Sequence, residues 1–172
     1  MNFSRKKIIE YSKKYDVRYK GTSDEVVENE LKRWFLKHRY LDRRHFIKLG
    51  LWKSRRQKKN YESEENDDLT VKEMTSFALR TKSEIARIRS LMTLRGVSWP
   101  VASVILHFAF PNKYSILDFR VIWSLGWSQP KYYTFDFWQK YVNKLRQLAK
   151  KYKVSLRTSD KALWYYSKEN QK

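Results

Sequence analysis

The feature that most constrains this chain lies in residues 91–120, where a short turn separates two apolar helical patterns. The turn, residues 94–98, contains Gly96, and glycine takes the positive φ of a sharp helix-to-helix turn without a steric penalty. Residues from about 83 to 110 are therefore predicted to form a hairpin of two helices. Leu91 closes the first apolar pattern and Trp99 opens the second.

The start of the second hairpin helix is predicted to bind an anion. Ser98 can cap that helix, and Pro100 suits its first turn because a proline lacks the N–H that the helix cannot use there. The exposed backbone N–H groups of the turn lie at the N-terminus of the helix, which is the positive end of the helix dipole. Together they predict a seat for a phosphate group.

The turn and the residues after it resemble the helix-hairpin-helix DNA glycosylase superfamily. The hairpin of that family reads roughly L-P-G-V-G-x-K-T-A and is followed by a catalytic aspartate. Here Asp118 stands eighteen positions after Pro100, which is the spacing of the family. The resemblance covers about thirty residues closely and the flanking helices by general pattern. The matching hairpin residues are Leu94, Gly96, Val97 and Ala102, whereas Arg95 and Ser98 depart from the pattern.

The resemblance implies that Asp118 is a catalytic carboxylate. Cleavage of the bond between a base and its sugar builds positive charge on the sugar ring, which a carboxylate can stabilise or discharge by activating water. Pro100 falls where bifunctional members carry a nucleophilic lysine, so a monofunctional enzyme that leaves an abasic site is implied. The other reading of Asp118 is an N-cap for a short helix that begins at Phe119.

The charge of the chain also indicates a nucleic acid as the partner. Thirty-eight Lys and Arg against eighteen Asp and Glu give a formal charge of +20, which steers a protein onto a polyanion. Double-stranded DNA is the predicted partner, and an RNA-binding helical domain is a weaker rival. The predicted DNA-binding residues are Arg95, Gly96, Val97, Ser98, Trp99, Arg120, Lys53, Arg55 and Arg56.

Aromatic residues make up 16% of the chain, and flipped bases are commonly held between aromatic or apolar side chains. Most of these residues recur at helical spacing and are predicted to be core. Trp52 differs because it stands where an apolar helix gives way to a basic segment. It is predicted to line a base pocket or groove, with packing at the helix end as the alternative.

The chain contains no cysteine, which excludes disulfides, thiol catalysis and the iron–sulfur cluster of some glycosylases, and no zinc site is predicted. His107 lies in an apolar helical pattern and is interpreted as structural. The resemblance implies a monovalent cation, K⁺ or Na⁺, on the hairpin carbonyls of Leu94 and Val97. No segment has membrane-spanning length, so we expect a cytoplasmic monomer, nucleoid-associated if bacterial.

The length of the chain favours one compact domain over residues 1–172. An all-α fold is predicted because only four glycines and three prolines interrupt the chain and no strand pattern is clear. Capping residues and apolar periodicity predict the helices, and residues 54–69 are predicted to be a loop with little to bury. Helices are expected at 4–14, from Thr22, at 41–52, from Thr70 to 81, from Ser83, at 99–110, after Asp118, from Thr134 and from Ser159.

Two settings suit the implied activity. A monofunctional glycosylase can act in base excision repair, or it can defend a cell against phage DNA that carries modified, for example glucosylated hydroxymethyl, cytosine. The alternative from another class is a non-catalytic helix-hairpin-helix module that only binds DNA. The hairpin, the basic surface and a capping Asp118 would be present in that protein as well.

Overall fold

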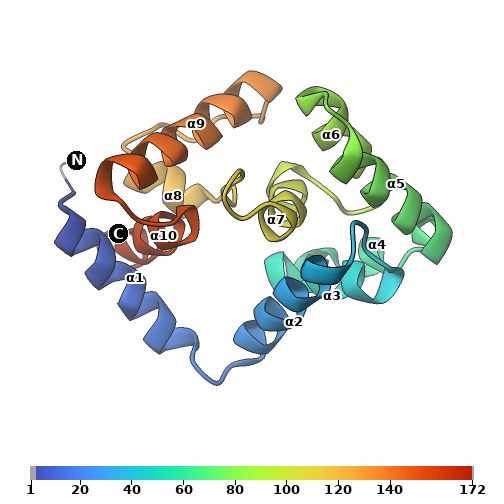
Figure 1. Cartoon of the computed structure of the whole chain (residues 1–172), viewed down its shortest axis with the longest axis horizontal. Coiled ribbons are helices and arrows are strands. Elements are labelled where there is room, and N and C mark those ends of the chain that lie inside the picture. The colour runs from blue at the N-terminus through green and yellow to red at the C-terminus, as the bar shows by residue number, and fades with distance from the viewer. Residues whose placement is uncertain (1–2, 172) are drawn as a thin grey trace. The chain divides into compact units, whose positions relative to one another are not determined.

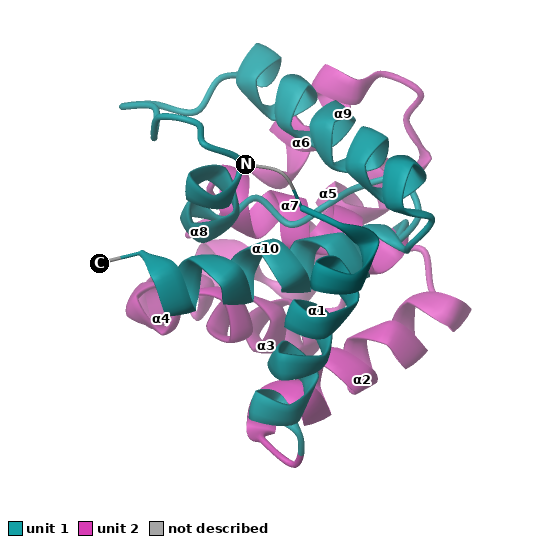
Figure 2. Ribbon diagram, turned by 90° about the vertical axis from the view of Figure 1, so that its left-hand side faces the viewer, with its two compact units in different colours: residues 1–20, 110–172 teal, residues 21–109 magenta. Residues whose placement is uncertain are grey.

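The computed structural model describes residues 3–171, and each regular element in that range is a helix, so the predicted all-α class is confirmed (Figure 1). The chain divides into two compact units, which Figure 2 shows in different colours. The first unit contains the described residues up to Lys20 and those from Phe110 onwards, and the second contains Gly21 to Ala109. The hairpin therefore belongs to the second unit and Asp118 to the first.

The first unit pairs the helix near the beginning of the chain with the one near its end. Helix α1 lies along α10, which also packs against α8 and α9. Tyr166 contributes to this core by placing its ring edge-on to Tyr11, 5.2 Å between centroids, and Ser124 Oγ donates to the Leu163 carbonyl at 2.6 Å. The helices of this unit are α1 (Arg5–Tyr19), α8 (Phe119–Ser124), α9 (Phe135–Tyr152) and α10 (Leu156–Asn170).

The second unit is built around α7, in which every residue from Trp99 to Phe108 except Pro100 is buried. A helix that is apolar all round is stable only inside a core, and here α2, α3 and α6 pack against it. Its helices are α2 (Ser23–Lys37), α3 (Arg43–Lys53), α4 (Lys58–Tyr61), α5 (Asp68–Arg80), α6 (Glu84–Leu91) and α7 (Trp99–Ala109), with 3₁₀ turns η1 (Arg55–Gln57) and η2 (Glu64–Asn66).

The segment 54–69 corrects the prediction of a loop with little to bury. It contains η1, α4 and η2, and the side chains of Tyr61 and Asn66 are completely buried. The segment is too polar for a helical period to be visible, because its one buried apolar side chain is a tyrosine. That tyrosine lies where two glycines leave room for it.

Tyr61 packs between Gly50 of α3 and Gly96 of the hairpin turn. A Cβ atom on Gly50 would lie 2.7 Å from the Tyr61 ring, and one on Gly96 would lie 2.8 Å from it. Real Cβ atoms do not approach a ring that closely, so both positions require glycine as long as Tyr61 keeps its place. Burial also raises the pKa of Tyr61 to about 12, which keeps the phenol neutral at physiological pH.

Most of the predicted helix starts are confirmed by a capping hydrogen bond. Ser83, Thr134 and Asp118 each accept a backbone N–H at the start of α6, α9 and α8. Two caps were predicted wrongly, since Asp67 rather than Thr70 caps α5 and Ser155 rather than Ser159 caps α10.

Both errors have a local physical cause. The Asp67 carboxylate accepts the Thr70 N–H at 2.6 Å, and this hydrogen bond lowers the pKa of Asp67. Helix α9 ends at Tyr152, and its C-cap Lys153 adopts the left-handed conformation with φ 51°, so the connection to α10 is short. Ser159 then falls inside α10, where it is buried.

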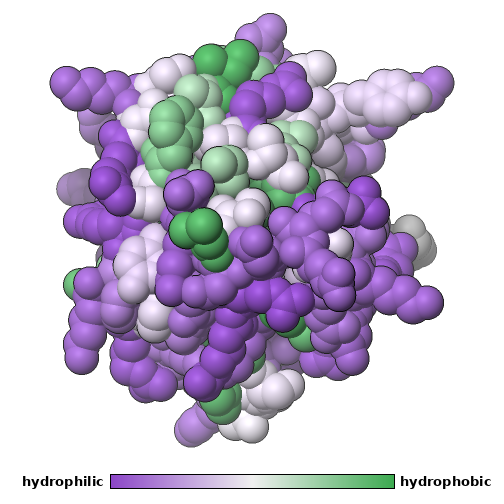
Figure 3. Space-filling model, turned by 90° about the vertical axis from the view of Figure 1, so that its right-hand side faces the viewer, coloured by the Kyte–Doolittle hydropathy of each residue, from purple (hydrophilic) through white to green (hydrophobic). Residues whose placement is uncertain are grey.

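The surface has the polar character that the composition requires. The face drawn in Figure 3 is mostly hydrophilic, with apolar side chains in small groups. Exposed large apolar residues in the second unit include Leu36, Leu69 and Phe77, which come from separate helices or from opposite ends of one.

The packing of Tyr61 leads to a stability prediction. Tyr61→Ala should lower the free energy of unfolding by about 3–5 kcal/mol, because a fully buried aromatic side chain is removed. Tyr61→Phe keeps the ring between the two glycines and should cost about 1 kcal/mol or less. Urea denaturation followed by far-UV circular dichroism measures both, and equal losses for the two variants would show that the phenol group, not the ring, is what matters.

Candidate nucleic-acid interface

The hairpin turn has the backbone that the sequence predicts. Gly96 adopts φ +84°, and the Val97 N–H donates to the Leu94 carbonyl at 3.1 Å to close the turn. The side chains of Leu94 and Val97 are buried, so these two residues can meet a ligand only through their backbone atoms. The turn leads into α7 at Trp99, and the Ser98 carbonyl accepts the Ala102 N–H.

Asn66 fixes the turn to the segment before α5. Its Nδ2 donates to the Arg95 carbonyl at 3.1 Å and to the Asn60 and Tyr61 carbonyls at 2.9 and 3.2 Å. Its Oδ1 accepts the Arg95 N–H at 2.8 Å. An amide side chain that is completely buried and satisfied in this way holds its neighbours rigidly. Asn66 thus joins the hairpin to α4 and η2.

The same hydrogen bonds correct the expectation that every amide of the turn is available to an anion. The N–H groups of Arg95 and Val97 already have acceptors. Within residues 3–171, the N–H groups of Gly96 and Ser98 donate no hydrogen bond. The phosphate seat is therefore reduced to these two amides and the first turn of α7, where the helix dipole is positive.

Basic side chains lie on the elements that brace the hairpin. Helix α4 touches the turn, because a Cβ on Gly96 would also lie 3.0 Å from the Asn60 Cβ. The residues just before it in the chain are strongly basic. Lys53 ends α3, and the exposed basic side chains of η1 and α4 are Arg55, Arg56, Lys58 and Lys59. The basic segment noted in the sequence, residues 53–59, therefore extends into α4, the element next to the hairpin.

Two of these arginines have acidic neighbours. Arg95 lies 3.4 Å from a Glu65 oxygen, and Arg55 lies 3.5 Å from Asp24. All four side chains remain well exposed to solvent, so each pair contributes little to stability. A phosphate could replace either carboxylate at small cost.

The contacts of two tryptophans are mainly structural. Trp52 Nε1 donates to the Asp24 carbonyl at 3.1 Å, and its ring lies edge-on to Phe108. The Trp99 side chain is buried, with the Arg89 guanidinium 5.4 Å from its ring centre. The described contacts match the packing alternative for Trp52, and its place in a base pocket stays a prediction.

Asp118 begins α8 in the first unit and is half-buried. Its Oδ1 accepts the Arg120 N–H at 3.0 Å, so the predicted capping role is present. The residues before it are anchored by Tyr141, whose hydroxyl donates to the Ile116 carbonyl at 2.6 Å. Burial raises the pKa of Tyr141 well above its usual value, and the negative charges of Asp160 and Asp118 raise it further. Tyr141 therefore stays a neutral donor beside the carboxylate.

Sequence reasoning missed two polar residues near Asp118. Burial raises the pKa of Tyr133, and the charge of Asp118 adds to this shift. The Tyr133 hydroxyl accepts a hydrogen bond from Gln129 Nε2 at 2.6 Å. Both residues lie in the connection between α8 and α9, which has no periodicity to mark it.

Arg120 is held between aromatic rings of the first unit. Its guanidinium carbon lies 5.1 Å from the Phe119 ring centre and 5.3 Å from that of Trp164. Cation–π contacts use the face of the guanidinium and leave its N–H edge for an oxygen ligand. This geometry suits the predicted role as a phosphate ligand.

Other types of site have no support in the described part of the chain. Within residues 3–171, no group of three or more His, Cys, Asp or Glu side chains could hold a metal ion. None of the helices there is both long and apolar enough to cross a membrane. His107 is buried in α7 with its ring 5.6 Å from that of Phe108.

Comparison with known proteins yields no relative. No protein-family model matches the chain, and no curated protein or solved structure matches it. The similarity to the glycosylases therefore depends on the hairpin residues and the spacing of Asp118.

The hairpin geometry leads to a binding prediction with a matched control. Gly96→Ala introduces a Cβ that clashes with Tyr61 in a backbone that disfavours side chains, so the turn must shift. Affinity for duplex DNA of any sequence should fall on the order of tenfold. Gly21 has a similar φ of +74° but nothing within 4 Å of its Cβ position.

Gly21→Ala therefore carries the same backbone strain without the clash, and its DNA affinity should stay within about twofold of wild type. Fluorescence anisotropy with a labelled duplex measures both variants, and circular dichroism confirms that each is folded. Equal affinities for the two variants would remove the hairpin from the interface.

Proposed function

We propose that the protein is a monofunctional DNA glycosylase that hydrolyses the N-glycosidic bond of a damaged or modified base. The observation that carries the proposal is a braced hairpin, with Gly96 at φ +84°, followed at the glycosylase spacing by Asp118 at the start of α8. A hairpin alone supports only DNA binding. The aspartate at this spacing supports the chemistry.

The hairpin would bind the DNA backbone. The amides of Gly96 and Ser98 and the N-terminal turn of α7 offer hydrogen-bond donors at the positive end of a helix dipole. Such contacts bind phosphate without reading sequence. The basic side chains of residues 53–59 would add charge to the same unit's DNA-facing surface.

Asp118 would carry the chemical step. As the bond between C1′ and the base nitrogen breaks, its electron pair goes to the base, which takes up a proton, and the sugar gains positive charge. A carboxylate stabilises that charge and can take a proton from the water whose oxygen then bonds to C1′. The capping bond from the Arg120 N–H occupies Oδ1 and fixes the orientation of the carboxylate.

Pro100 supports the monofunctional form of the reaction. A lysine at this position would attack C1′ and form a Schiff base, which leads to strand cleavage, whereas proline has no amine. Pro100 stands in the first turn of α7, where a proline costs the helix no hydrogen bond. The product would be an intact strand with an abasic site.

A monovalent cation at the hairpin, which the resemblance implies, is compatible with the turn. Among residues 3–171 the Leu94 carbonyl accepts the Val97 N–H alone, so one of its two lone pairs remains for a K⁺ or Na⁺ ion. The carbonyl of Val97 would be the second ligand. Such an ion would supply positive charge next to a bound phosphate.

A non-catalytic DNA-binding module is the second candidate, and the capping bond of Asp118 favours it. A side chain that accepts the Arg120 N–H has a structural reason to be an aspartate. The two candidates differ in one property, which is whether the charge of Asp118 matters beyond the cap. The choice between repair and phage defence depends on the base excised, and a panel of duplexes with lesions and modified cytosines decides it.

The test replaces Asp118 with asparagine, which keeps the size and much of the capping ability but removes the charge. Single-turnover excision on the best duplex of the panel should fall on the order of a hundredfold or more, because the stabilising charge is lost. DNA affinity and melting temperature should change little. Strands should remain intact until alkali is added.

Asp42→Asn is the matched control, because Asp42 caps α3 by accepting the His45 N–H at 2.7 Å and lies in the other unit. It should excise at nearly the wild-type rate. If Asp118→Asn lowers melting temperature and binding together without a separate loss of excision, Asp118 is a structural cap and the binding module is the better account.

A further inference from the structure

Two cations of the first unit lie against one tryptophan, and a third lies against the tyrosine that packs on it. Arg18 comes from α1, Arg120 from α8 and Lys168 from α10. The Arg120 guanidinium carbon and Lys168 Nζ lie 5.3 and 5.9 Å from the centre of the Trp164 ring. Arg18 lies 5.9 Å from the ring of Tyr19, which itself packs edge-on to Trp164 at 6.0 Å.

None of the three cations is neutralised by the described protein. Within residues 3–171, no carboxylate oxygen lies within 4.0 Å of the charged nitrogens of Arg18, Arg120 or Lys168. Lys14, one turn before Arg18 on α1, shows the contrast. It pairs with Glu169 at 3.1 Å and with Glu10 at 3.7 Å, and these carboxylates raise its pKa.

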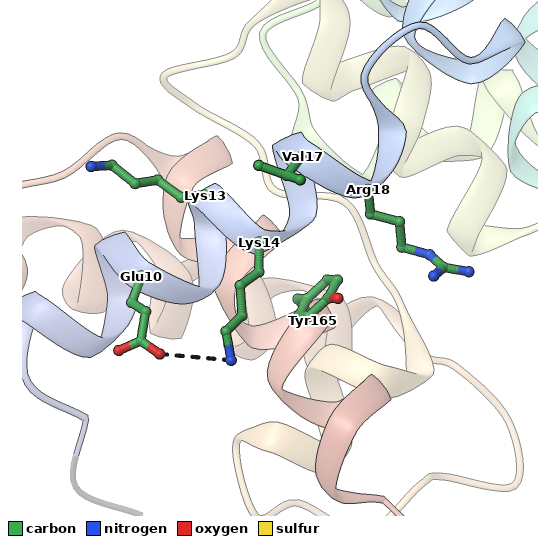
Figure 4. A pocket seen from close by; sticks show the side chains of 6 residues that line it. All are labelled: Glu10, Lys13, Lys14, Val17, Arg18 and Tyr165. Carbon is green, nitrogen blue, oxygen red and sulfur yellow. Dashed lines mark ion pairs between the residues drawn. The ribbon is translucent and has the colours of Figure 1, made fainter.

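Figure 4 shows the difference on α1. Lys14 points toward Glu10 beside a surface cavity of about 580 Å³, whereas the guanidinium of Arg18 points away from that ion pair. Arg18 also lines this cavity, but it has no carboxylate partner within residues 3–171, whereas Lys14 is already paired.

The cations interact with one another. Burial lowers the pKa of Lys168, and the positive charges of Arg18 and Arg120 lower it further. A folded protein that holds three like charges together without a counter-ion loses stability unless an anion is supplied from outside. The three cations lie against aromatic rings, and no carboxylate within residues 3–171 takes their N–H groups, so these groups remain for oxygen ligands.

We propose that Arg18, Arg120 and Lys168 form a binding site for a backbone phosphate of a nucleic-acid strand, in the first unit and separate from the hairpin seat. The oxygens of a phosphate accept hydrogen bonds from the planar N–H edges of the two arginines and are attracted by the compact charge of the lysine. Phe119, which is 52% exposed beside Arg120, offers an apolar surface to the sugar next to that phosphate. Nucleic acid is favoured over a small anion because the chain carries +20.

The site adds to the proposed function without depending on catalysis. It concerns DNA binding, so it rests on that part of the proposed function but not on Asp118 or on excision. A protein that binds DNA through these residues and excises nothing would keep this proposal and lose the glycosylase.

The test compares two double variants with the same loss of charge. Arg18→Gln with Lys168→Gln removes two members of the site, and Lys13→Gln with Lys150→Gln removes two exposed lysines of α1 and α9 outside it. Duplex affinity is measured by anisotropy from low to moderate salt. The site variant should bind about tenfold more weakly at low salt, and its log–log salt slope should be smaller by about one, as for one lost phosphate contact.

The control variant should bind within about twofold of wild type with a slope that is nearly unchanged. A second arm titrates inorganic pyrophosphate at matched ionic strength and follows the melting temperature of each protein. If the two double variants lose duplex affinity equally, only net charge matters and the proposal is wrong. If they differ for pyrophosphate but not for DNA, the site takes a small anion and the assignment to nucleic acid is overturned.

Discussion

The packing of Tyr61 between Gly50 and Gly96 is the constraint on which the second unit depends. One aromatic ring takes the space that two side chains would need, and it thereby brings α3, α4 and the hairpin turn into contact. Asn66 adds hydrogen bonds between two of these elements, to the carbonyls of Asn60 and Tyr61 in α4 and of Arg95 in the turn. The hairpin is thus held from outside by the segment 54–69 as well as by its own two helices.

This bracing has a consequence for binding. A helix N-terminus binds a phosphate tightly only if its amides are already in place, since otherwise ordering the turn costs part of the binding free energy. The Asn66 hydrogen bonds occupy the Arg95 amide and in return fix the direction of the amides of Gly96 and Ser98. The same segment brings basic side chains, so the geometry and the charge of the proposed seat come from one stretch of sequence.

The sequence allowed much of the fold and the main elements of the site to be predicted. The helix period, the caps at Ser83 and Thr134, the positive φ of Gly96 and the cap at Asp118 were predicted from local patterns, because each depends on residues close in the chain. The helices of residues 54–69 were not predicted. They depend on Tyr61 meeting Gly50 and Gly96, which is a contact between residues far apart in sequence.

The residues that the sequence analysis missed also depend on contacts between segments far apart in the chain. The charge of Asp118 raises the pKa of Tyr133 from another segment of the chain, and Arg18 and Lys168 lie on α1 and α10, which pack along one another. Neither helical periodicity nor the spacing of motifs in the sequence predicts such contacts. The charge excess predicted a polyanionic partner, whereas only the fold shows which cations lack a carboxylate.

The most direct test of the central claim, that the braced hairpin is a phosphate-binding element, is amide hydrogen exchange of the wild-type protein with and without saturating duplex DNA. The account predicts that exchange slows at Gly96 and Ser98 on binding, because their N–H groups gain phosphate acceptors. The amide of Arg95, which already donates to Asn66, should exchange slowly in both states. Unchanged exchange at Gly96 and Ser98 in a protein shown to be DNA-bound would contradict it.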